Sequence, residues 1–199
     1  MTAQHRGVFL DRDGTINEEV DFLRTPEEVR LIPGAGAAIR LLNEQHLVTC
    51  VISNQSGVAR GFLTEADLLP IHQRLERELE RDHARLDQIY YCPHHPTEGQ
   101  PPYDIACDCR KPKTGMLRKG AEEFGLDLKR SFVVGDRIVD IQAGQAVGAT
   151  TILVLTGYGK TAVEECSREG VRPDLTAGSI VEAVHFIVSR IDGERTSHG

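Results

Sequence analysis

The chain has 199 residues, 40% of them hydrophobic and 27% charged, which is the composition of an ordinary globular protein with one sizeable core. The formal net charge of −7 and the 5% aromatic content count against a nucleic-acid-binding protein, which needs a basic face or a stacking platform. No apolar stretch approaches the ~20 residues of a membrane span, and the polar start Met1–Arg6 does not resemble a signal peptide. We therefore expect a cytoplasmic monomer, one domain over residues 1–199, that binds neither nucleic acid nor membrane.

The first predicted element is a short buried strand over residues 7–10, which stops at the two carboxylates Asp11 and Asp13. Alternation along an extended segment predicts that these two side chains point the same way and Arg12 the opposite way. Gly14-Thr15 then lets the backbone turn sharply away from them. Two carboxylates held side by side repel each other, so a metal ion or a raised pKa is expected there.

Strands and helices alternate along the rest of the chain. Further strands are predicted over 48–52, 89–91, 132–134 and 151–155. Helices are predicted over 35–45, 64 to about 85, 114–124, about 139–147 and 179–191, with loops over 16–31, 92–109 and 157–161 and a polar, frayed tail over 193–199. This alternation predicts an α/β fold, a Rossmann-like parallel sheet with right-handed crossovers and helices on both faces, without an interdomain linker.

Polar, reactive side chains follow several of these strands. They are Asp11 and Asp13 after the first strand, Ser53 and Asn54 after the second, Arg110, Lys111 and Lys113 after the third and its loop, and Asp136 and Asp140 after the fourth. Singly, Ser53 fits a strand-end turn, and Asp136 fits a helix N-cap. Because ligands of an open α/β sheet bind at the carboxyl ends of the strands, the ordered set predicts the functional site at that edge.

Together these residues resemble a known set of four motifs. Phe9-Leu-Asp11-Arg-Asp13-Gly-Thr, Ser53-Asn-Gln, Lys111 and Gly135-Asp136-Arg-x-x-Asp140 are similar to the motifs of the haloacid dehalogenase (HAD) superfamily of phosphatases. The resemblance covers residues 8–155, most of the chain. It implies a HAD-like fold and phosphate-ester hydrolysis through an aspartyl-phosphate intermediate.

The resemblance also implies which residues are catalytic. Asp11 would attack phosphorus, and Asp13 would protonate the leaving oxygen and then activate water. Ser53 and Lys111 would hold the phosphoryl oxygens as charge shifts in the transition state.

A magnesium site is implied by the same motifs. Mg²⁺ would be held by the Asp11 carboxylate, the main-chain carbonyl of Asp13 and the Asp136 carboxylate. Asp140 would orient the surroundings of the metal rather than bind it.

The loop over 92–109 carries a second set of metal-binding residue types. They are Cys92, His94, Cys107 and Cys109, with twelve residues between the second and the third. Three thiolates and an imidazole are the ligands of a closed, structural zinc site, which would pin a proline-rich loop and which favours a reducing cytoplasm over disulfides. His95 could compete with His94 as the ligand, and we choose His94 because it follows the family pattern. The alternative is a loop whose cysteines bind no metal.

Cys92-Pro-His-His-Pro…Cys107-Asp-Cys-Arg-Lys-Pro resembles one HAD subgroup in particular, shared by bacterial D-glycero-D-manno-heptose 1,7-bisphosphate phosphatases and histidinol-phosphate phosphatases. Both lack a large cap domain, and this chain has no long insertion. The run from Ser53 to Thr64 and the twelve-residue spacer between His94 and Cys107 resemble the heptose branch, which releases the 7-phosphate during synthesis of heptose for lipopolysaccharide or surface glycans. The alternative is a histidinol-phosphate phosphatase, since Arg137 stands where the heptose enzymes have lysine.

The resemblance carries over a set of substrate-binding residues. They are Asp11, Arg12, Asp13, Glu19, Val20, Asp21, Phe22, Ser53, Asn54, Gln55, Ser56, Arg110, Lys111 and Arg137. Arg110 beside Lys111 supplies a second cation, which suits a sugar with a second phosphate. Two hypotheses from other classes stay open: a zinc-containing nucleic-acid module, and a HAD scaffold that binds without catalysis, against which the intact motif residues count.

Overall fold

The structure is a computed structural model that describes residues 5–196, and the expectations for Met1–Gln4 and for 197–199 lie outside them. Within the described residues, six parallel strands form one sheet in the order β3-β2-β1-β4-β5-β6. The strands are β1 (Gly7–Leu10), β2 (Val48–Asn54), β3 (Gln88–Cys92), β4 (Phe132–Gly135), β5 (Thr150–Val154) and β6 (Leu175–Ala177). The helices are α1 (Ala35–Glu44), α2 (Glu65–Glu80), α3 (Gly115–Phe124), α4 (Ile138–Val147), α5 (Gly159–Glu169) and α6 (Ile180–Thr196), with 3-10 turns at Pro26–Glu28 and Leu128–Arg130.

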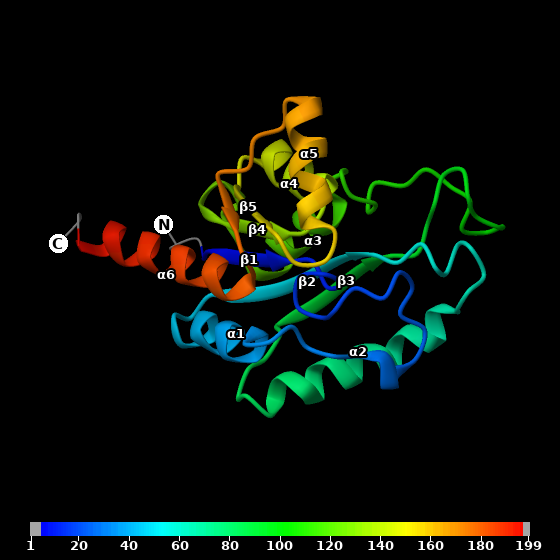
Figure 1. Ribbon diagram of the computed structural model, residues 1–199, viewed down its shortest axis with the longest axis horizontal. Helices are drawn as coiled ribbons and strands as arrows, with labels where there is room; N and C mark the ends of the chain where they lie inside the picture. Colours follow the sequence, from blue (N-terminus) through cyan, green and yellow to red (C-terminus); the bar gives the residue numbers. More distant parts are fainter. Residues whose placement is uncertain (1–4, 197–199) are drawn as a thin grey trace.

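Helices cover both faces of the sheet, which confirms the predicted α/β class (Figure 1). Helices α1, α2 and α6 pack on one face, α3 and α4 pack on the other, and α5 lies beside α4. The strand order reverses between β1 and β4, where an open α/β sheet forms its ligand crevice. Asp11 and Asp136 directly follow these two strands, so the order of the sheet brings two of the predicted motifs together.

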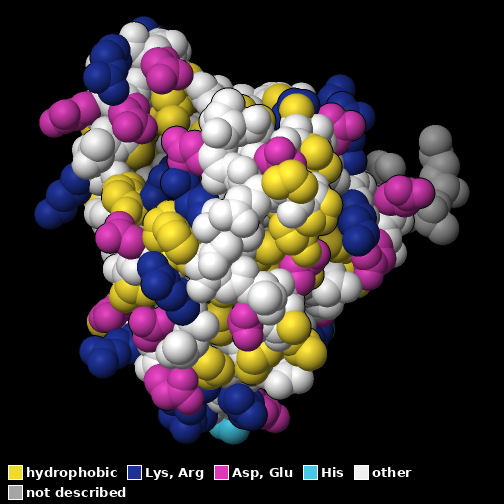
Figure 2. Space-filling model, turned by 90° about the vertical axis from the view of Figure 1, so that its right-hand side faces the viewer, with side chains coloured by type: hydrophobic (Ala, Val, Ile, Leu, Met, Phe, Trp, Pro, Cys, Tyr) yellow, Lys and Arg dark blue, Asp and Glu magenta, His cyan; other side chains and the backbone are white. Residues whose placement is uncertain are grey.

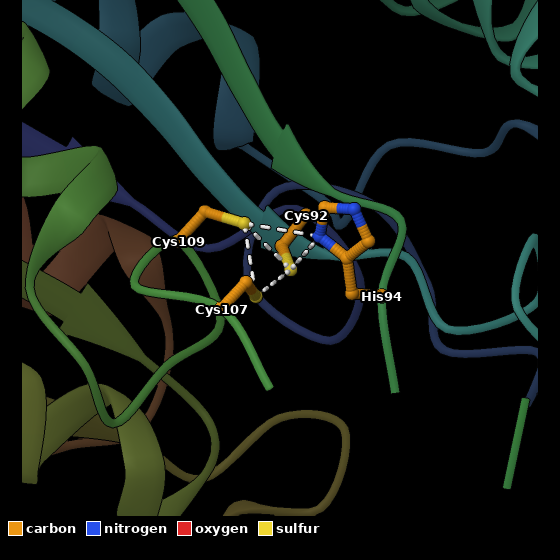
Figure 3. Close-up of side chains that lie close together, drawn as sticks. All are labelled: Cys92, His94, Cys107 and Cys109. Atoms are coloured by element: carbon orange, nitrogen blue, oxygen red, sulfur yellow. Dashed lines mark hydrogen bonds between the residues drawn. The ribbon is translucent and has the colours of Figure 1, made fainter. Parts of the chain in front are cut away.

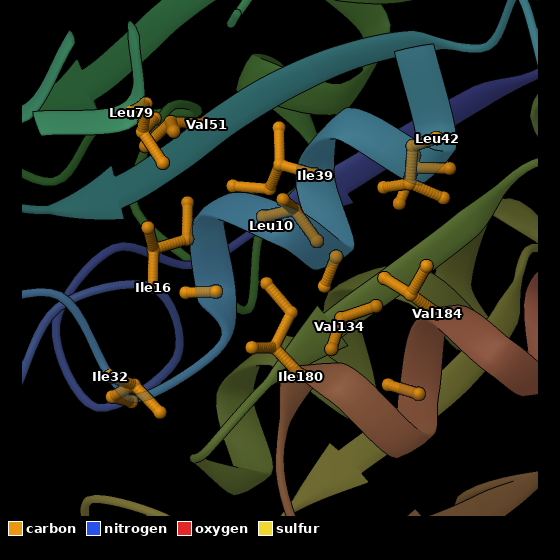
Figure 4. Close-up of a cluster of buried hydrophobic side chains, with 14 of the residues drawn as sticks. Leu10, Ile16, Ile32, Ile39, Leu42, Val51, Leu79, Val134, Ile180 and Val184 are labelled. Atoms are coloured by element: carbon orange, nitrogen blue, oxygen red, sulfur yellow. The ribbon is translucent and has the colours of Figure 1, made fainter. Parts of the chain in front are cut away.

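The period of two in β1 divides the core between the two faces of the sheet. Val8 and Leu10 belong to the larger cluster, under α1, α2 and α6, whereas Phe9 belongs to the cluster under α3 and α4. Helix α1 buries Ala35, Ala38, Ile39 and Leu42, the spacing of one helix face, into the larger cluster (Figure 4). This packing fixes β1, and with it the start of the first motif.

The structure differs from the sequence prediction at several elements. Helix α5 begins at Gly159, within the glycine-rich loop predicted over 157–161. Strand β6 was not predicted because three residues are too few to show a periodic pattern. Helix α2 ends at Glu80 rather than near Arg85, before His83 adopts a left-handed conformation with φ 58°. Helix α6 continues to Thr196, so part of the predicted tail is helical.

Among the described residues, the helices lack the combination of length and apolarity that crossing a bilayer requires.

We predict that Ile39→Ala lowers the free energy of unfolding by about 2–5 kcal/mol, because it removes a fully buried side chain from the larger cluster. Urea unfolding would show a lower midpoint with an unchanged slope. The exposed neighbour Arg40→Ala, the control, should change stability by less than about 0.5 kcal/mol. Equal effects of the two substitutions would contradict the packing described here.

Candidate active site

A cavity of about 590 Å³ opens at the carboxyl edge of the sheet and is lined by residues from all four predicted motif regions. The predicted substrate-binding residues that line it are Asp11, Asp13, Glu19, Asp21, Phe22, Ser53, Asn54, Gln55, Ser56, Arg110, Lys111 and Arg137. Val20 lines a second cavity on the loop that follows β1. Figure 2 faces the edge where the loops after the strands lie, and basic side chains there alternate with acidic ones rather than forming a basic stripe.

Lys111 joins two carboxylates in the wall of the cavity. Its ammonium lies 2.7 Å from Asp11 Oδ1 and 2.5 Å from Asp140 Oδ1, and it donates to the carbonyl of Ile52 at 2.7 Å. Burial disfavours the charged amine, but the two carboxylates outweigh that effect and raise the pKa of Lys111 above its usual value. Burial also raises the pKa of Asp11, to about 6, although the nearby lysine charge lowers it.

Asp136 lies deeper, in a cradle that two glycines form. A Cβ at Gly14 or at Gly157 would come within 2.2 Å of Asp136 Oδ2, so both positions need glycine, and both have positive φ. Oδ2 accepts a hydrogen bond from the Tyr158 N–H at 2.8 Å, whereas Oδ1, fully buried, has no hydrogen-bond partner among the described residues. Burial, followed by the charges of Asp11 and Asp140, raises the pKa of Asp136 to about 8.

These acidic residues fit a divalent cation. Ligand oxygens of Asp11, Asp136 and Asp140 lie within 4.8 Å of one another, and all three residues are buried. A carboxylate oxygen without a partner and an acidic cluster with one nearby ammonium are the donor set of a hard cation such as Mg²⁺. Asp140 is also engaged elsewhere, because its Oδ2 accepts from the Arg137 N–H at 3.0 Å.

The side chain of Arg12 does not point away from Asp13, contrary to the sequence prediction. The guanidinium turns onto the neighbouring carboxylate and makes two hydrogen bonds to it, of 2.9 and 2.7 Å. The alternation rule fails here because β1 ends at Leu10 and the chain turns at once, with the N–H groups of Ile16 and Asn17 bonded to the Arg12 carbonyl. Arg12 is 1% exposed, and it is not among the residues that line the cavity.

Tyr158 is a residue of the cavity wall that the sequence analysis missed. The guanidinium of Arg137 lies 3.9 Å from the centre of the Tyr158 ring, and the phenol donates to Asp21 at 2.6 Å. Glu19 lies beside this group, and burial together with the charge of Asp13 raises its pKa to about 7. An aromatic residue between two glycines after a predicted strand was the available signal, but nothing in the sequence joined it to Arg137.

Arg60 is a second missed residue, and it connects three loops at the mouth of the cavity. Its guanidinium pairs with Glu98 of the cysteine-containing loop and lies 5.6 Å from the centre of the Phe22 ring. Arg110 lines the same cavity and donates to the carbonyl of His94 at 3.2 Å. Arg110, directly after this loop, therefore adds a cationic side chain to the wall of the cavity.

Four side chains of this loop converge on one point (Figure 3). The sulfur atoms of Cys92, Cys107 and Cys109 are 3.0 to 3.4 Å apart, and Nδ1 of His94 lies 3.4 Å from the nearest sulfur. A tetrahedral zinc site with Zn–S bonds of ~2.3 Å places its thiolates ~3.8 Å apart, close to this arrangement. His95 is not part of this cluster, and its Nδ1 accepts from main-chain N–H groups of the loop.

The cluster of Cys92, His94, Cys107 and Cys109 lies next to Lys111 in the chain. Two residues after Cys109, the main chain of Lys111 is held by the side chain of Asn54, which accepts from its N–H at 3.0 Å and donates to its carbonyl at 3.1 Å. The end of β2 and the end of the cysteine loop thus jointly fix the position of the Lys111 side chain.

Comparison with known proteins agrees with this geometry. A HAD-hydrolase-like family matches residues 108–183. The chain is 36% identical over 184 residues to D-glycero-beta-D-manno-heptose-1,7-bisphosphate 7-phosphatase of Haemophilus ducreyi, covering 92% of this chain and 98% of the relative. It is 39% identical over 188 residues to D-glycero-D-manno-heptose-1,7-bisphosphate 7-phosphatase of Thermosynechococcus vestitus, covering 92% and 96%. The crystal structure of D,D-heptose 1,7-bisphosphate phosphatase from B. bronchiseptica, complexed with magnesium and phosphate, is similar with a TM-score of 0.82 and 32% identity, covering 93% of this chain and 99% of that one.

We predict that the affinity of the protein for Mg²⁺ rises with pH between about 6 and 8, by up to about tenfold per pH unit, and then levels off. The reason is that the raised pKa of Asp136, about 8, leaves this carboxyl protonated at lower pH, and the ion must displace that proton. Calorimetric titration in two buffers of different ionisation enthalpy would measure both the affinity and the proton release. Asp136→Asn should weaken binding and flatten the pH dependence, and an affinity of the native protein that is constant from pH 6 to 8 would contradict the prediction.

Proposed function

The chain belongs to the family of D-glycero-D-manno-heptose-1,7-bisphosphate 7-phosphatases within the HAD superfamily, and we propose that it removes the 7-phosphate from this sugar to give heptose 1-phosphate. The observation that carries the proposal is the buried Lys111 between Asp11 and Asp140, at the point where the strand order reverses. Both relatives compared above are heptose-1,7-bisphosphate 7-phosphatases by name. The histidinol-phosphate alternative has no support among them.

We assign the attack on phosphorus in the first step to Asp11. Its carboxylate is fixed by Lys111 at 2.7 Å, and it lines the cavity next to Asp13. The carboxylate oxygen forms the bond to phosphorus while the bond from phosphorus to the sugar oxygen breaks, which gives an aspartyl phosphate. Ser53 and Lys111 line the same cavity and would hold the oxygens of the transferring group.

Proton transfer is assigned to Asp13. In the first step it gives a proton to the departing sugar oxygen, and in the second it takes a proton from the water that hydrolyses the aspartyl phosphate. A separate carboxylate for proton transfer is needed because Asp11 is covalently occupied between the two steps. Asp11 and Asp13 line the same cavity, whereas Arg12 between them is buried.

A magnesium ion would be held by the carboxylates of Asp11 and Asp136 and by the main-chain carbonyl of Asp13. When bound, it supplies positive charge that neutralises the phosphoryl oxygens and orients the group for in-line attack. The solved relative with magnesium and phosphate supports this ion. Asp140 orients its neighbours instead, through its contacts with Lys111 and with the Arg137 N–H.

The second phosphate of the substrate is assigned to Arg110 and Arg137 on the cavity wall. Stacking on Tyr158 restricts the guanidinium of Arg137, so less rotational freedom is lost when an anion binds. Glu19 to Phe22 would contact the sugar through main-chain groups and hydrogen-bond acceptors.

The cysteine loop is proposed to hold a structural zinc ion through Cys92, His94, Cys107 and Cys109. We further propose that the whole chain works as one catalytic domain, as a monomer in the cytoplasm, where a step of heptose synthesis for lipopolysaccharide or surface glycans would take place. The strands that place the motifs all belong to one sheet, which supports the single catalytic unit.

Mg²⁺-dependent phosphate release from heptose 1,7-bisphosphate, in both anomers, should exceed that from histidinol phosphate in kcat/KM by ~100-fold or more, about 2.7 kcal/mol of transition-state discrimination. Product analysis should give heptose 1-phosphate. Asp11→Asn should abolish turnover without changing the melting temperature by more than a few degrees. A preference for histidinol phosphate, or an Asp11→Asn variant with native turnover, would disprove the assignment.

Replacement of a proposed zinc ligand should loosen the loop that leads into Arg110 and Lys111. We expect Cys109→Ser to lose zinc, to melt at a lower temperature and to show a raised KM for the bisphosphate. The matched control is Cys166→Ser, which alters a cysteine of α5 outside the cluster and should retain zinc and KM. A Cys109→Ser protein that is free of zinc by elemental analysis, yet fully stable and active, would refute the structural zinc site.

A further inference from the structure

Arg12 is the largest fully buried side chain in the described part of the chain, and the mechanism above gives it no task. Burial of a guanidinium is unfavourable unless a carboxylate compensates its charge. Asp13 does so with two hydrogen bonds: Nε donates to Oδ1 at 2.9 Å and Nη2 donates to Oδ2 at 2.7 Å. This two-point contact fixes both the position and the plane of the carboxylate.

Gln55 completes the contact from the loop after β2 and is itself 6% exposed. Its Oε1 accepts from Arg12 Nη2 at 3.0 Å, and because a guanidinium can only donate, this bond determines which end of the amide faces Arg12. The Nε2 group then donates in two directions, to Asp13 Oδ2 at 3.0 Å and to Ser53 Oγ at 2.7 Å.

The second of these bonds keeps the Ser53 hydroxyl hydrogen from pointing at Gln55. Since Oγ accepts from Gln55, its own hydrogen is free to point elsewhere, and Ser53 lines the cavity. A single amide therefore connects the proposed proton donor, Asp13, to a proposed ligand of the phosphoryl oxygens. Arg12 does not line the cavity, so it acts through Asp13.

We propose that Arg12 and Gln55 are positioning residues that hold Asp13 for proton transfer to the leaving oxygen and couple it to Ser53. The inference rests on the proposed function in taking Asp13 as the proton donor and Ser53 as a ligand of the phosphoryl oxygens. As the bond from phosphorus to the ester oxygen breaks, its electron pair passes to that oxygen, which takes the proton of the Asp13 carboxyl. A sugar alkoxide is a poor leaving group and depends on this proton, whereas p-nitrophenolate leaves without it.

The test compares these two leaving groups. For Gln55→Leu we expect kcat/KM on the sugar phosphate to fall about 10- to 100-fold, and kcat/KM on p-nitrophenyl phosphate to fall less than about threefold. Because kcat/KM reports the steps up to departure of the leaving group, hydrolysis of the intermediate does not enter the comparison. Gln73→Leu, the same change at an exposed position of α2, is the control and should leave both values unchanged.

A double-substitution cycle separates positioning of Asp13 from a general loss of structure. Asp13→Asn should show the same bias against the sugar substrate, and adding Gln55→Leu to it should cost little more on that substrate. Arg12→Met should behave as Gln55→Leu does, and if it does not fold, the Gln55→Leu comparison decides alone. Equal losses on the two substrates, no loss on either, or fully additive losses in the cycle would each overturn the proposal.

The choice of substrate keeps this test apart from the proposed function. If the native protein fails to cleave the heptose bisphosphate but cleaves another alkyl phosphate, the assigned substrate is wrong. The leaving-group comparison can then be made with that alkyl phosphate, and its result still confirms or overturns the positioning of Asp13.

Discussion

The site depends on a charge imbalance buried at the edge of the sheet. Asp11, Asp136 and Asp140 are packed together with low exposure, and Lys111 is the one ammonium in contact with two of them within residues 5–196. Burial makes ionised carboxyls costly, and their mutual repulsion adds to that cost, so the pKa values of Asp11 and Asp136 are raised. A bound divalent cation would compensate the excess negative charge, and the same carboxylates would hold it.

Three separate parts of the chain must cooperate to place that lysine. Asn54, at the end of β2, bonds to both main-chain groups of Lys111, and the cluster of the cysteine loop ends two residues before it. The reversal of strand order brings Asp11 and Asp136 to the same crevice, and the glycines around Asp136 let the backbone approach it closely. A structural zinc ion at a distance from the cavity would thus act on catalysis through the position of one ammonium.

The parts of the site that follow strands could be predicted from the sequence, because a buried strand and the polar residues after it form a local pattern. Asp11, Ser53 and Asp136 are found this way, and parallel strands then bring them to one edge. The direction of Arg12 was predicted wrongly, since alternation ends where the strand ends. Tyr158 and Arg60 could not be predicted because their neighbours, Arg137 and Phe22, come from distant loops. The three-residue β6 has too little pattern to be recognised.

Two carboxylates divide the proposed reaction, with Asp11 bonded to phosphorus between two in-line displacements. The stereochemical course at phosphorus tests this most directly, with a substrate whose 7-phosphate is made chiral by oxygen isotopes and transferred to an acceptor alcohol. Each in-line displacement inverts the configuration, so we expect two of them to give net retention. Net inversion would mean that water or the acceptor attacks the substrate directly, and would contradict the covalent part assigned to Asp11.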